Sequence, residues 1–204
     1  SAIVLAPDTN DAPKYGEPSV VVINGQVHLY VHSLSWNGEG SIWLFLSNDE
    51  GRSFQNGTLV ASAPESAQGR VSAPSVSCLG QSCVLAALAG ESGSIHLADG
   101  PPEGPFVWRP EPVLEATEDF ETGGIGSPSV LLELDQIRLY YTARSGVDEP
   151  SVIAGGELRA GVFTRWGPLL SPSQTCTDAS GNALTCWDEA GIGEPEVKIA
   201  RTGT

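Results

Sequence analysis

The sequence is poor in basic residues. Lys and Arg number 10 against 25 Asp and Glu, which gives a formal charge of −15 and an isoelectric point near 4.3. A protein that binds a phosphate backbone or docks on anionic lipid needs a basic face. The composition therefore argues against nucleic acids and membrane surfaces as partners. The sequence also lacks any run of about 18 apolar residues, so no membrane-spanning segment is predicted.

Methionine is absent, and the chain opens with Ser1. We therefore expect that the chain begins after a cleavage, or was shortened at its N-terminus, and that no signal peptide remains in it. Charged residues are also sparse, at 17%, while hydrophobic residues make up 40%, so we expect a packed core rather than a disordered acidic tail. The 24 Gly and 15 Pro residues imply many turns, which favours an all-β fold.

Cysteine is scarce, and its four copies form two close pairs, Cys78/Cys83 and Cys176/Cys186. Neither pair has the spacing of a zinc knuckle, and no His pair lies nearby. The spacing favours two short-loop disulfides, although four buried thiols in a cytosolic protein would fit the same count. Together with the acidity and the missing initiator methionine, disulfides favour an exported protein that is secreted, periplasmic or on the cell surface.

Internal repetition is the main positive signal. Four segments begin alike, with a proline followed by Ser or Glu and then by Val. The prolines lie at positions 18, 74, 128 and 195, so the steps are 56, 54 and 67 residues. The segments are Gly16-Glu-Pro-Ser-Val20, Ser72-Ala-Pro-Ser-Val76, Gly126-Ser-Pro-Ser-Val130 and Gly193-Glu-Pro-Glu-Val197.

Each of the first three segments starts a series of four predicted strands. A hairpin comes first, as in strands 19–23 and 26–32, which an Asn24-Gly25 type I′ turn joins. The other predicted strands are 41–47 and 58–61, then 76–78, 83–88, 94–98 and 112–115, and then 129–132, 137–142, 151–155 and 167–170. Four antiparallel strands about every 50 residues are typical of β-propeller blades. A β-sandwich would not explain why Pro-Ser-Val recurs in register with the strand count.

We therefore predict an all-β chain that forms one β-propeller portion. Blade 1 covers about residues 17–62, blade 2 about 72–116 and blade 3 about 126–171, and a fourth blade starts at about 193–204. Residues 2–6 parallel the fourth strand of blade 1, so we expect them to close the ring as an outer strand. Because part of a five-bladed ring would then be unfilled, we expect a second polypeptide, or a region absent from this sequence, to complete it.

One turn carries a specific motif. Ser47-Asn-Asp-Glu-Gly-Arg-Ser-Phe54 matches the Asp-box pattern S-x-D-x-G-x-[ST]-[FW]. Asp49 can accept amides of the turn, Gly51 can take a positive φ, and Phe54 can anchor the turn in the blade core. The segment resembles the Asp-boxes of sialidase-like propellers, which are structural and lie between strands 3 and 4. No catalytic role is predicted for it.

Two further segments resemble five-bladed propeller glycosidases of the arabinanase, β-xylosidase, fructosidase and mannoside-phosphorylase type families. Residues 126–143 resemble the hairpin of strands 1 and 2 in a blade, and residues 95–106 resemble the turn between strands 3 and 4. The resemblance implies a five-bladed β-propeller with three carboxylates that face an axial cavity. One would be a base or nucleophile, one would orient and tune, and one would be the general acid.

The position before each blade proline is where the resemblance places such carboxylates. It holds Glu17, Ala73, Ser127 and Glu194, so two of the four are acidic and the usual triad is not intact. If the protein is an enzyme, Glu17 and Glu194 are the catalytic candidates, with one acid from a neighbouring loop and water as nucleophile. The alternative is that both residues only accept backbone amides at the start of a blade.

The loops before the third and fourth inner strands supply further candidates. We predict glycan-binding residues among Asp119, Glu121, Trp187, Asp188 and Glu189, although a solvated acidic loop would have the same composition. The alternation of His28, Tyr30 and His32 fits a packed strand face better than a metal site. Ca²⁺ is conceivable with so many acids, but no loop has a calcium-ligand spacing, so no cofactor and no metal site are predicted.

The predicted function is an exported, glycoside hydrolase-like propeller that hydrolyses or only binds a glycan at its axial cavity. The alternative is a non-catalytic recognition or structural propeller that binds a protein partner or its own processed second chain. Fold resemblance alone favours the first.

Overall fold

The computed structural model describes residues 14–34, 39–90, 93–172, 176–177, 183–184 and 191–198. Within these ranges the regular structure is β-strand, apart from two three-residue 3-10 helices, η1 (Glu65–Ala67) and η2 (Asp119–Glu121). The predicted closing strand 2–6 lies outside the described residues, as do Cys186, Trp187, Asp188 and Glu189. No helix in the described part is long and apolar enough to cross a bilayer.

Three four-stranded antiparallel sheets follow one another along the chain, and in each sheet the strands pair in sequence order. We refer to them as blades 1, 2 and 3. Blade 1 contains β1 (Lys14–Ile23), β2 (Gln26–Leu34), β3 (Gly40–Ser47) and β4 (Thr58–Ser62). Blade 2 contains β5 (Val71–Leu79), β6 (Ser82–Ala89), β7 (Ser94–Gly100) and β8 (Val107–Trp108). Blade 3 contains β9 (Gly124–Leu132), β10 (Ile137–Arg144), β11 (Val152–Arg159) and β12 (Val162–Leu170). A short pair follows, β13 (Cys176–Thr177) and β14 (Ala183–Leu184).

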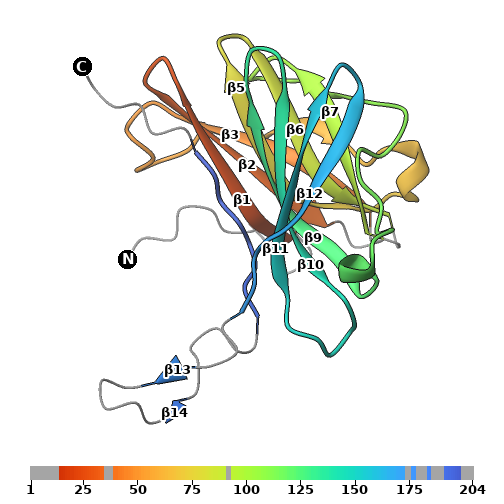
Figure 1. The fold of residues 1–204 in the computed structure, drawn as a ribbon. Coiled ribbons are helices and arrows are strands. Elements are labelled where there is room, and N and C mark those ends of the chain that lie inside the picture. The colour runs from red at the N-terminus through yellow and green to blue at the C-terminus, as the bar shows by residue number, and fades with distance from the viewer. Residues whose placement is uncertain are drawn as a thin grey trace.

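The first strands of the blades lie next to one another. β1 contacts β5, and β5 contacts β9, so the three sheets fan out from these inner strands (Figure 1). Residues 191–198 continue the series, because the Val197 amide donates to Ser129 Oγ at 3.0 Å and the Glu194 amide donates to Thr142 Oγ1 at 3.0 Å. The all-β propeller prediction is therefore confirmed, with about three complete blades and the beginning of the next one.

One hydrogen bond recurs at each junction between inner strands. The Ser of the Pro-Ser-Val segment accepts the amide of the Val in the next such segment. The three bonds are Val76 N to Ser19 Oγ, Val130 N to Ser75 Oγ and Val197 N to Ser129 Oγ, each at 3.0 Å. We call this series the serine ladder. It gives the repeated Ser a physical reason, because an inner-strand amide turned away from its own sheet still needs an acceptor.

Two apolar layers hold neighbouring blades together. The layer between blades 1 and 2 includes Tyr30, Ile42 and Leu85, all at 0% exposure. The layer between blades 2 and 3 includes Leu97 and Leu139. Side chains alternate between the two faces of a strand, so the middle blade supplies both layers. Each buried Leu or Ile contributes about 1.5–3 kcal/mol, which makes blade stacking the main source of stability.

Five strands differ clearly from their predicted positions. The inner strands β1, β5 and β9 each begin five residues before the predicted start. The other two are the fourth strands of blades 2 and 3. The fourth strand of blade 2 was expected at 112–115, but β8 lies at Val107–Trp108. Pro110 has no amide to donate, so pairing with β7 stops there. The chain returns to β7 at Leu114, where the Val113 amide donates to the Ile95 carbonyl at 2.9 Å.

The last strand of blade 3 begins at Val162 instead of 167. Ala160 and Gly161 both have left-handed backbones, with φ of 51° and 81°, and they form a tight turn that leads directly into β12. Ala is an unusual residue in the first position of such a turn, so no hairpin signal is present there.

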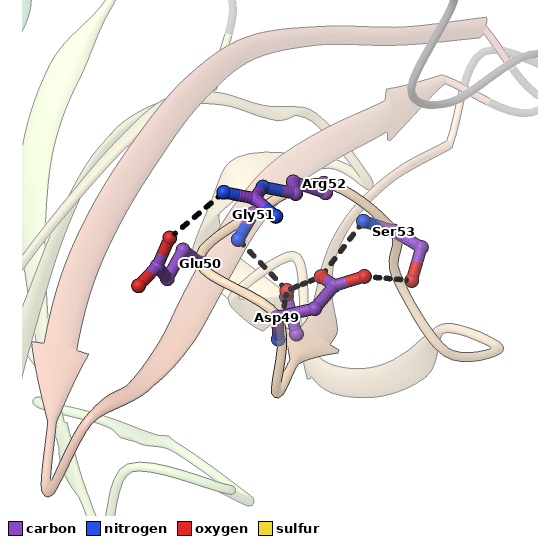
Figure 2. Close-up of polar contacts among 6 residues, drawn as sticks. Asp49, Glu50, Gly51, Arg52 and Ser53 are labelled. Atoms are coloured by element: carbon purple, nitrogen blue, oxygen red, sulfur yellow. Dashed lines mark hydrogen bonds and ion pairs between the residues drawn. The ribbon is translucent and has the colours of Figure 1, made fainter.

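The 47–54 turn joins β3 to β4 (Figure 2). Asp49 Oδ1 accepts the Ser53 amide at 2.9 Å and the Ser47 hydroxyl at 2.7 Å, and Oδ2 accepts the Ser53 hydroxyl at 2.6 Å. These bonds from Ser53 and Ser47 hold the pKa of Asp49 well below its usual range. Gly51 has a φ of 82°. Phe54 is only half-buried and does not join the apolar layers, which differs from the core anchor expected for it.

The predicted Cys78–Cys83 disulfide is present. The two residues lie opposite each other in the β5–β6 hairpin, with their Cα atoms 4.0 Å apart. The partner predicted for Cys176 is Cys186, which is outside the described residues, so the second disulfide stays a prediction.

Candidate functional site

The residue before each blade proline has the same uncommon backbone conformation. The φ angles of Glu17, Ala73, Ser127 and Glu194 are 47°, 47°, 44° and 53°. Left-handed backbones are rare outside glycine, and the residue before a proline normally prefers an extended conformation. Such strain costs about 1–3 kcal/mol per residue and persists only where the surrounding structure fixes it. The fold therefore holds four side chains at equivalent, strained places along the inner strands.

A cavity of about 660 Å³ lies along these inner strands. Its walls are the 17–22 part of β1, the 73–79 part of β5, the 127–132 part of β9 and residues 194–198. All four left-handed residues line it. Glu17 and Glu194 thus reach one cavity from the first and the fourth of four equivalent positions, and the cavity is large enough for a small ligand.

Glu17 is held at the junction of blades 1 and 2. Its Oε2 atom accepts the Ala73 amide at 2.8 Å, and His32 Nδ1 lies 2.9 Å from the same oxygen. The His32 ring is close but not aligned for a hydrogen bond. A Cβ at Gly16 would come within 2.9 Å of the ring, so glycine is needed there for His32 to approach. The other oxygen, Oε1, has no partner in the described part of the chain and is free for a ligand.

Glu194 lies at the junction of blade 3 with residues 191–198. Its amide is held by Thr142 Oγ1, whereas its carboxylate is exposed and makes no hydrogen bond or ion pair with the described residues. It also lines a second cavity of about 370 Å³. The other residues of that cavity are Ser127, Thr142, Arg144, Ser151 and Gly193. The two carboxylates therefore have different environments, one anchored and one free.

Glu121 and Asp119, predicted as glycan-binding residues, do not line either cavity. Glu121 has 0% exposure and accepts the Tyr141 hydroxyl at 2.7 Å and Arg165 Nε at 3.2 Å. Burial alone would raise the pKa of Glu121, but the hydrogen bonds from Tyr141 and from the Thr117 and Glu118 amides, with the charge of Arg165, hold it below its ordinary value. Glu121 is thus a structural carboxylate that links η2 to β10 and β12 of blade 3. Asp119 lies in the same short helix and is exposed. We do not include either residue in the proposed site.

Of the alternating residues of β2, His28 and Tyr30 belong to the core, and His32 belongs to the candidate site. His28 and Tyr30 are buried, and the Tyr30 hydroxyl donates to the Pro102 carbonyl at 2.6 Å. Only His32 reaches Glu17. No group of three metal-ligating side chains occurs among the residues that the structure describes. No sequence motif predicted that His32 would lie beside Glu17, but Gly16, opposite His32 in the register of β1 and β2, is the feature that permits it.

No family model matches this sequence, and no curated protein matches it. Solved structures do match. Zg3597, a family 117 glycoside hydrolase from the marine bacterium Zobellia galactanivorans, superimposes with a TM-score of 0.64 at 16% identity, over 78% of this chain and 57% of that one. A thermostable family-43 glycoside hydrolase gives a TM-score of 0.60 at 18% identity, over 78% of this chain and 60% of that one.

A third structure comes from the GH130 family of mannoside phosphorylases, which contains glycoside hydrolases that target β-1,2 mannosidic linkages. It gives a TM-score of 0.61 at 12% identity, over 89% of this chain and 57% of that one. Identities this low establish the fold and leave the activity open. The chain thus has the fold of the glycosidase-type β-propellers and spans 57–60% of the length of these three proteins.

Proposed function

We propose that this protein binds a glycan in its axial cavity and acts on it as a glycoside hydrolase does. The observation that carries this proposal is the placement of Glu17 and Glu194, the two acidic residues among four equivalent strained positions, in the wall of one cavity. Residues held in strained backbones concentrate at functional sites. The fold that this chain shares with glycoside hydrolases supports the same proposal.

Glycoside hydrolysis needs two carboxyl groups whose environments differ, one to protonate the leaving oxygen and one to activate water or attack the sugar. Glu17 is oriented by the Ala73 amide and lies beside the His32 ring, while the Glu194 carboxylate has no partner in the described structure. We propose that this pair performs the chemistry. A third acid would be Asp188 or Glu189, which precede residues 191–198 in the sequence. Both lie outside the described residues, as does Trp187, which was predicted to bind the glycan with them.

A second function has one observation in its favour. Ala73 and Ser127 occupy two of the four equivalent positions, and Glu17 accepts a backbone amide, as a purely structural blade-start residue would. The alternative is therefore a non-catalytic recognition propeller, in which the same cavity or another face binds its partner without turnover.

The first test uses the isosteric variants Glu17→Gln and Glu194→Gln, with Glu50→Gln in the exposed 47–54 turn as the matched control. Turnover is measured on a panel of aryl glycosides, and binding is measured on plant, algal and bacterial polysaccharides. Removing a general acid or base lowers the rate by about 10²–10⁴-fold, so we expect that loss in both cavity variants and none in Glu50→Gln.

Glycan binding without turnover in the wild-type protein would favour the recognition function. Absence of both would reject glycan handling altogether. Full turnover in both Glu17→Gln and Glu194→Gln would mean that the protein is active but that this pair does not perform the chemistry.

We also propose that a second polypeptide, or a further region of the same polypeptide, completes the propeller and that the assembly is exported. Apolar side chains are exposed on both outer blades, with Val22 at 64% and Leu59 at 47% in blade 1, and Trp166 at 40% and Leu170 at 61% in blade 3. In the interior junctions, equivalent surfaces are covered by the next blade. The Cys78–Cys83 disulfide supports an oxidising compartment.

A further inference from the structure

The second cavity contains a basic residue that the proposed reaction does not use. Arg144 is the last residue of β10, and it lines the cavity of about 370 Å³ together with Ser127, Thr142, Ser151 and Glu194. The cavity adjoins the axial one, because Ser127 and Glu194 line both. A cation therefore lies next to the place where Glu194 would meet a sugar.

Arg144 differs from the other basic side chains that the structure describes. Six of them lie 2.6–3.4 Å from a carboxylate oxygen: Arg52, Arg109, Arg138, Arg159, Arg165 and Lys198. Arg70 also has a partner. The guanidinium of Arg144 makes no hydrogen bond or ion pair with any described residue. Arg144 is exposed, so its guanidinium, which no described carboxylate occupies, is accessible to an anionic group from outside.

Three hydroxyl groups surround the same cavity. Thr142 Oγ1 accepts the Glu194 amide, so its own proton is available to a further acceptor. Ser151 is 7% exposed, and neither its hydroxyl nor that of Ser127 has a hydrogen-bond partner in the described structure. A guanidinium provides a planar fork of donors that matches a carboxylate or sulfate, and neighbouring hydroxyls can donate to the remaining oxygens.

We propose that Arg144, with the hydroxyls of Ser127, Thr142 and Ser151, forms a subsite for the carboxylate or sulfate group of an acidic sugar. The proposal rests on the proposed glycan-binding function and narrows its ligand to acidic glycans. Glu194 in the same cavity disfavours a free inorganic anion by like charge. In an acidic sugar, however, ring hydroxyls can donate to Glu194 while the acidic substituent lies on Arg144.

The test measures binding by calorimetry to the complete assembly as purified. The probes are oligosaccharides of galacturonic and glucuronic acid, sulfated galactan oligosaccharides, neutral galactose and glucose oligosaccharides of the same lengths, and sodium phosphate. The variants are Arg144→Gln and Arg144→Lys. Arg159→Gln is the matched control, because it removes the same charge from blade 3 at the exposed β11–β12 turn, where Arg159 pairs with Asp135.

We expect an acidic oligosaccharide to bind more tightly than its neutral counterpart. Arg144→Gln should weaken binding of the acidic ligand about ten- to hundredfold, the range for a hydrogen bond to a charged group. The affinity for neutral ligands should stay unchanged. Arg144→Lys should recover part of the loss, because it keeps the charge without the fork. Arg159→Gln should match the wild type, and added salt should reduce the acidic preference.

Neutral binding with no acidic preference, or equal losses in Arg144→Gln and Arg159→Gln, would overturn the acidic subsite and leave the proposed function standing. Phosphate binding that depends on Arg144, without binding of any acidic oligosaccharide, would assign the subsite to a free anion and overturn it as well. No binding of any glycan would reject both proposals.

Discussion

His28 shows how one buried residue links the stability of this fold to pH. It is 1% exposed, and its Nδ1 atom has no hydrogen-bond partner in the described structure. Burial lowers its pKa below the ordinary value of 6.5, and the charge of Glu103 and the carbonyl of Pro102 offset this only in part. The unfolded chain therefore binds a proton more readily than the folded one. The stability linked to His28 is complete above about pH 6.5 and falls as the pH drops below that value.

We expect His28→Gln to reduce this acid sensitivity. The free energy of unfolding, measured by urea titration at about pH 7.5 and pH 5.5, should differ less between the two pH values in the variant than in the wild type. The comparison uses the difference between pH values because the substitution also changes packing against Tyr30. An equal or larger difference in the variant would contradict a neutral, buried His28. His96, whose pKa burial also lowers, should behave in the same way.

The sequence indicated the positions of Glu17 and Glu194 but not their conformation. Pro18 and Pro195 marked them, yet the rule for a residue before proline predicts an extended backbone, and both are left-handed. No sequence pattern indicated Arg144, because its interest comes from having no partner among the described residues. Glu121 was a candidate by its place in an acidic loop, and only the structure shows that Tyr141 and Arg165 occupy its carboxylate.

At the scale of elements, the serine ladder makes a specific prediction. Ser75→Ala removes the acceptor for the Val130 amide at the junction of β5 and β9. An amide left without an acceptor in a partly buried junction costs about 1–3 kcal/mol, so the variant should lose that much stability. Hydrogen exchange should also become faster at Val130 than in the wild type.

The control is Ser82→Ala, an exposed residue at the start of β6 in the same blade, which should stay within about 0.5 kcal/mol of the wild type. If both variants lose the same stability, the loss reflects the Ser-to-Ala change in blade 2 and not the ladder.

Strand order was more predictable than strand ends. The Asn24-Gly25 turn is a strong hairpin signal, and β1 and β2 flank it directly. The ends that differed depend on features with weak signals. The fourth strands of blades 2 and 3 depend on the interruption at Pro110 and the left-handed Ala160, and the inner strands continue through an irregularity at each blade proline. Burial on both faces also explains why β6 lacks a clear apolar-polar alternation, since it serves two apolar layers at once.

For the whole molecule, the exposed flanks of blades 1 and 3 predict assembly. We expect the protein to have a native mass above the 21.3 kDa of one chain, measured by native mass spectrometry or light scattering. Trp166→Glu should reduce the assembled fraction, because it places a charge on the open face of blade 3, where Trp166 packs edge-on against Tyr140. Leu134→Glu, at a residue 92% exposed in the β9–β10 turn, should not.

A stable 21.3 kDa monomer with a single cooperative melting transition would contradict the need for a complement. Equal effects of Trp166→Glu and Leu134→Glu would instead show that the open face of blade 3 is not where assembly occurs.

The serine ladder has a consequence for how such a molecule can evolve. In the three described junctions the hydroxyl comes from the earlier repeat and the amide from the later one. The Pro-Ser-Val peptides of β5 and β9 carry both groups, whereas the fourth segment has Glu196 in place of the Ser. Duplication of a repeat that carries both groups would therefore keep this hydrogen bond at the new junction, although the apolar layers would still have to fit. A polypeptide inserted in the opposite chain direction would not present its amides to those hydroxyls. This contact thus sets the chain direction of each added blade and does not itself set how many blades there are.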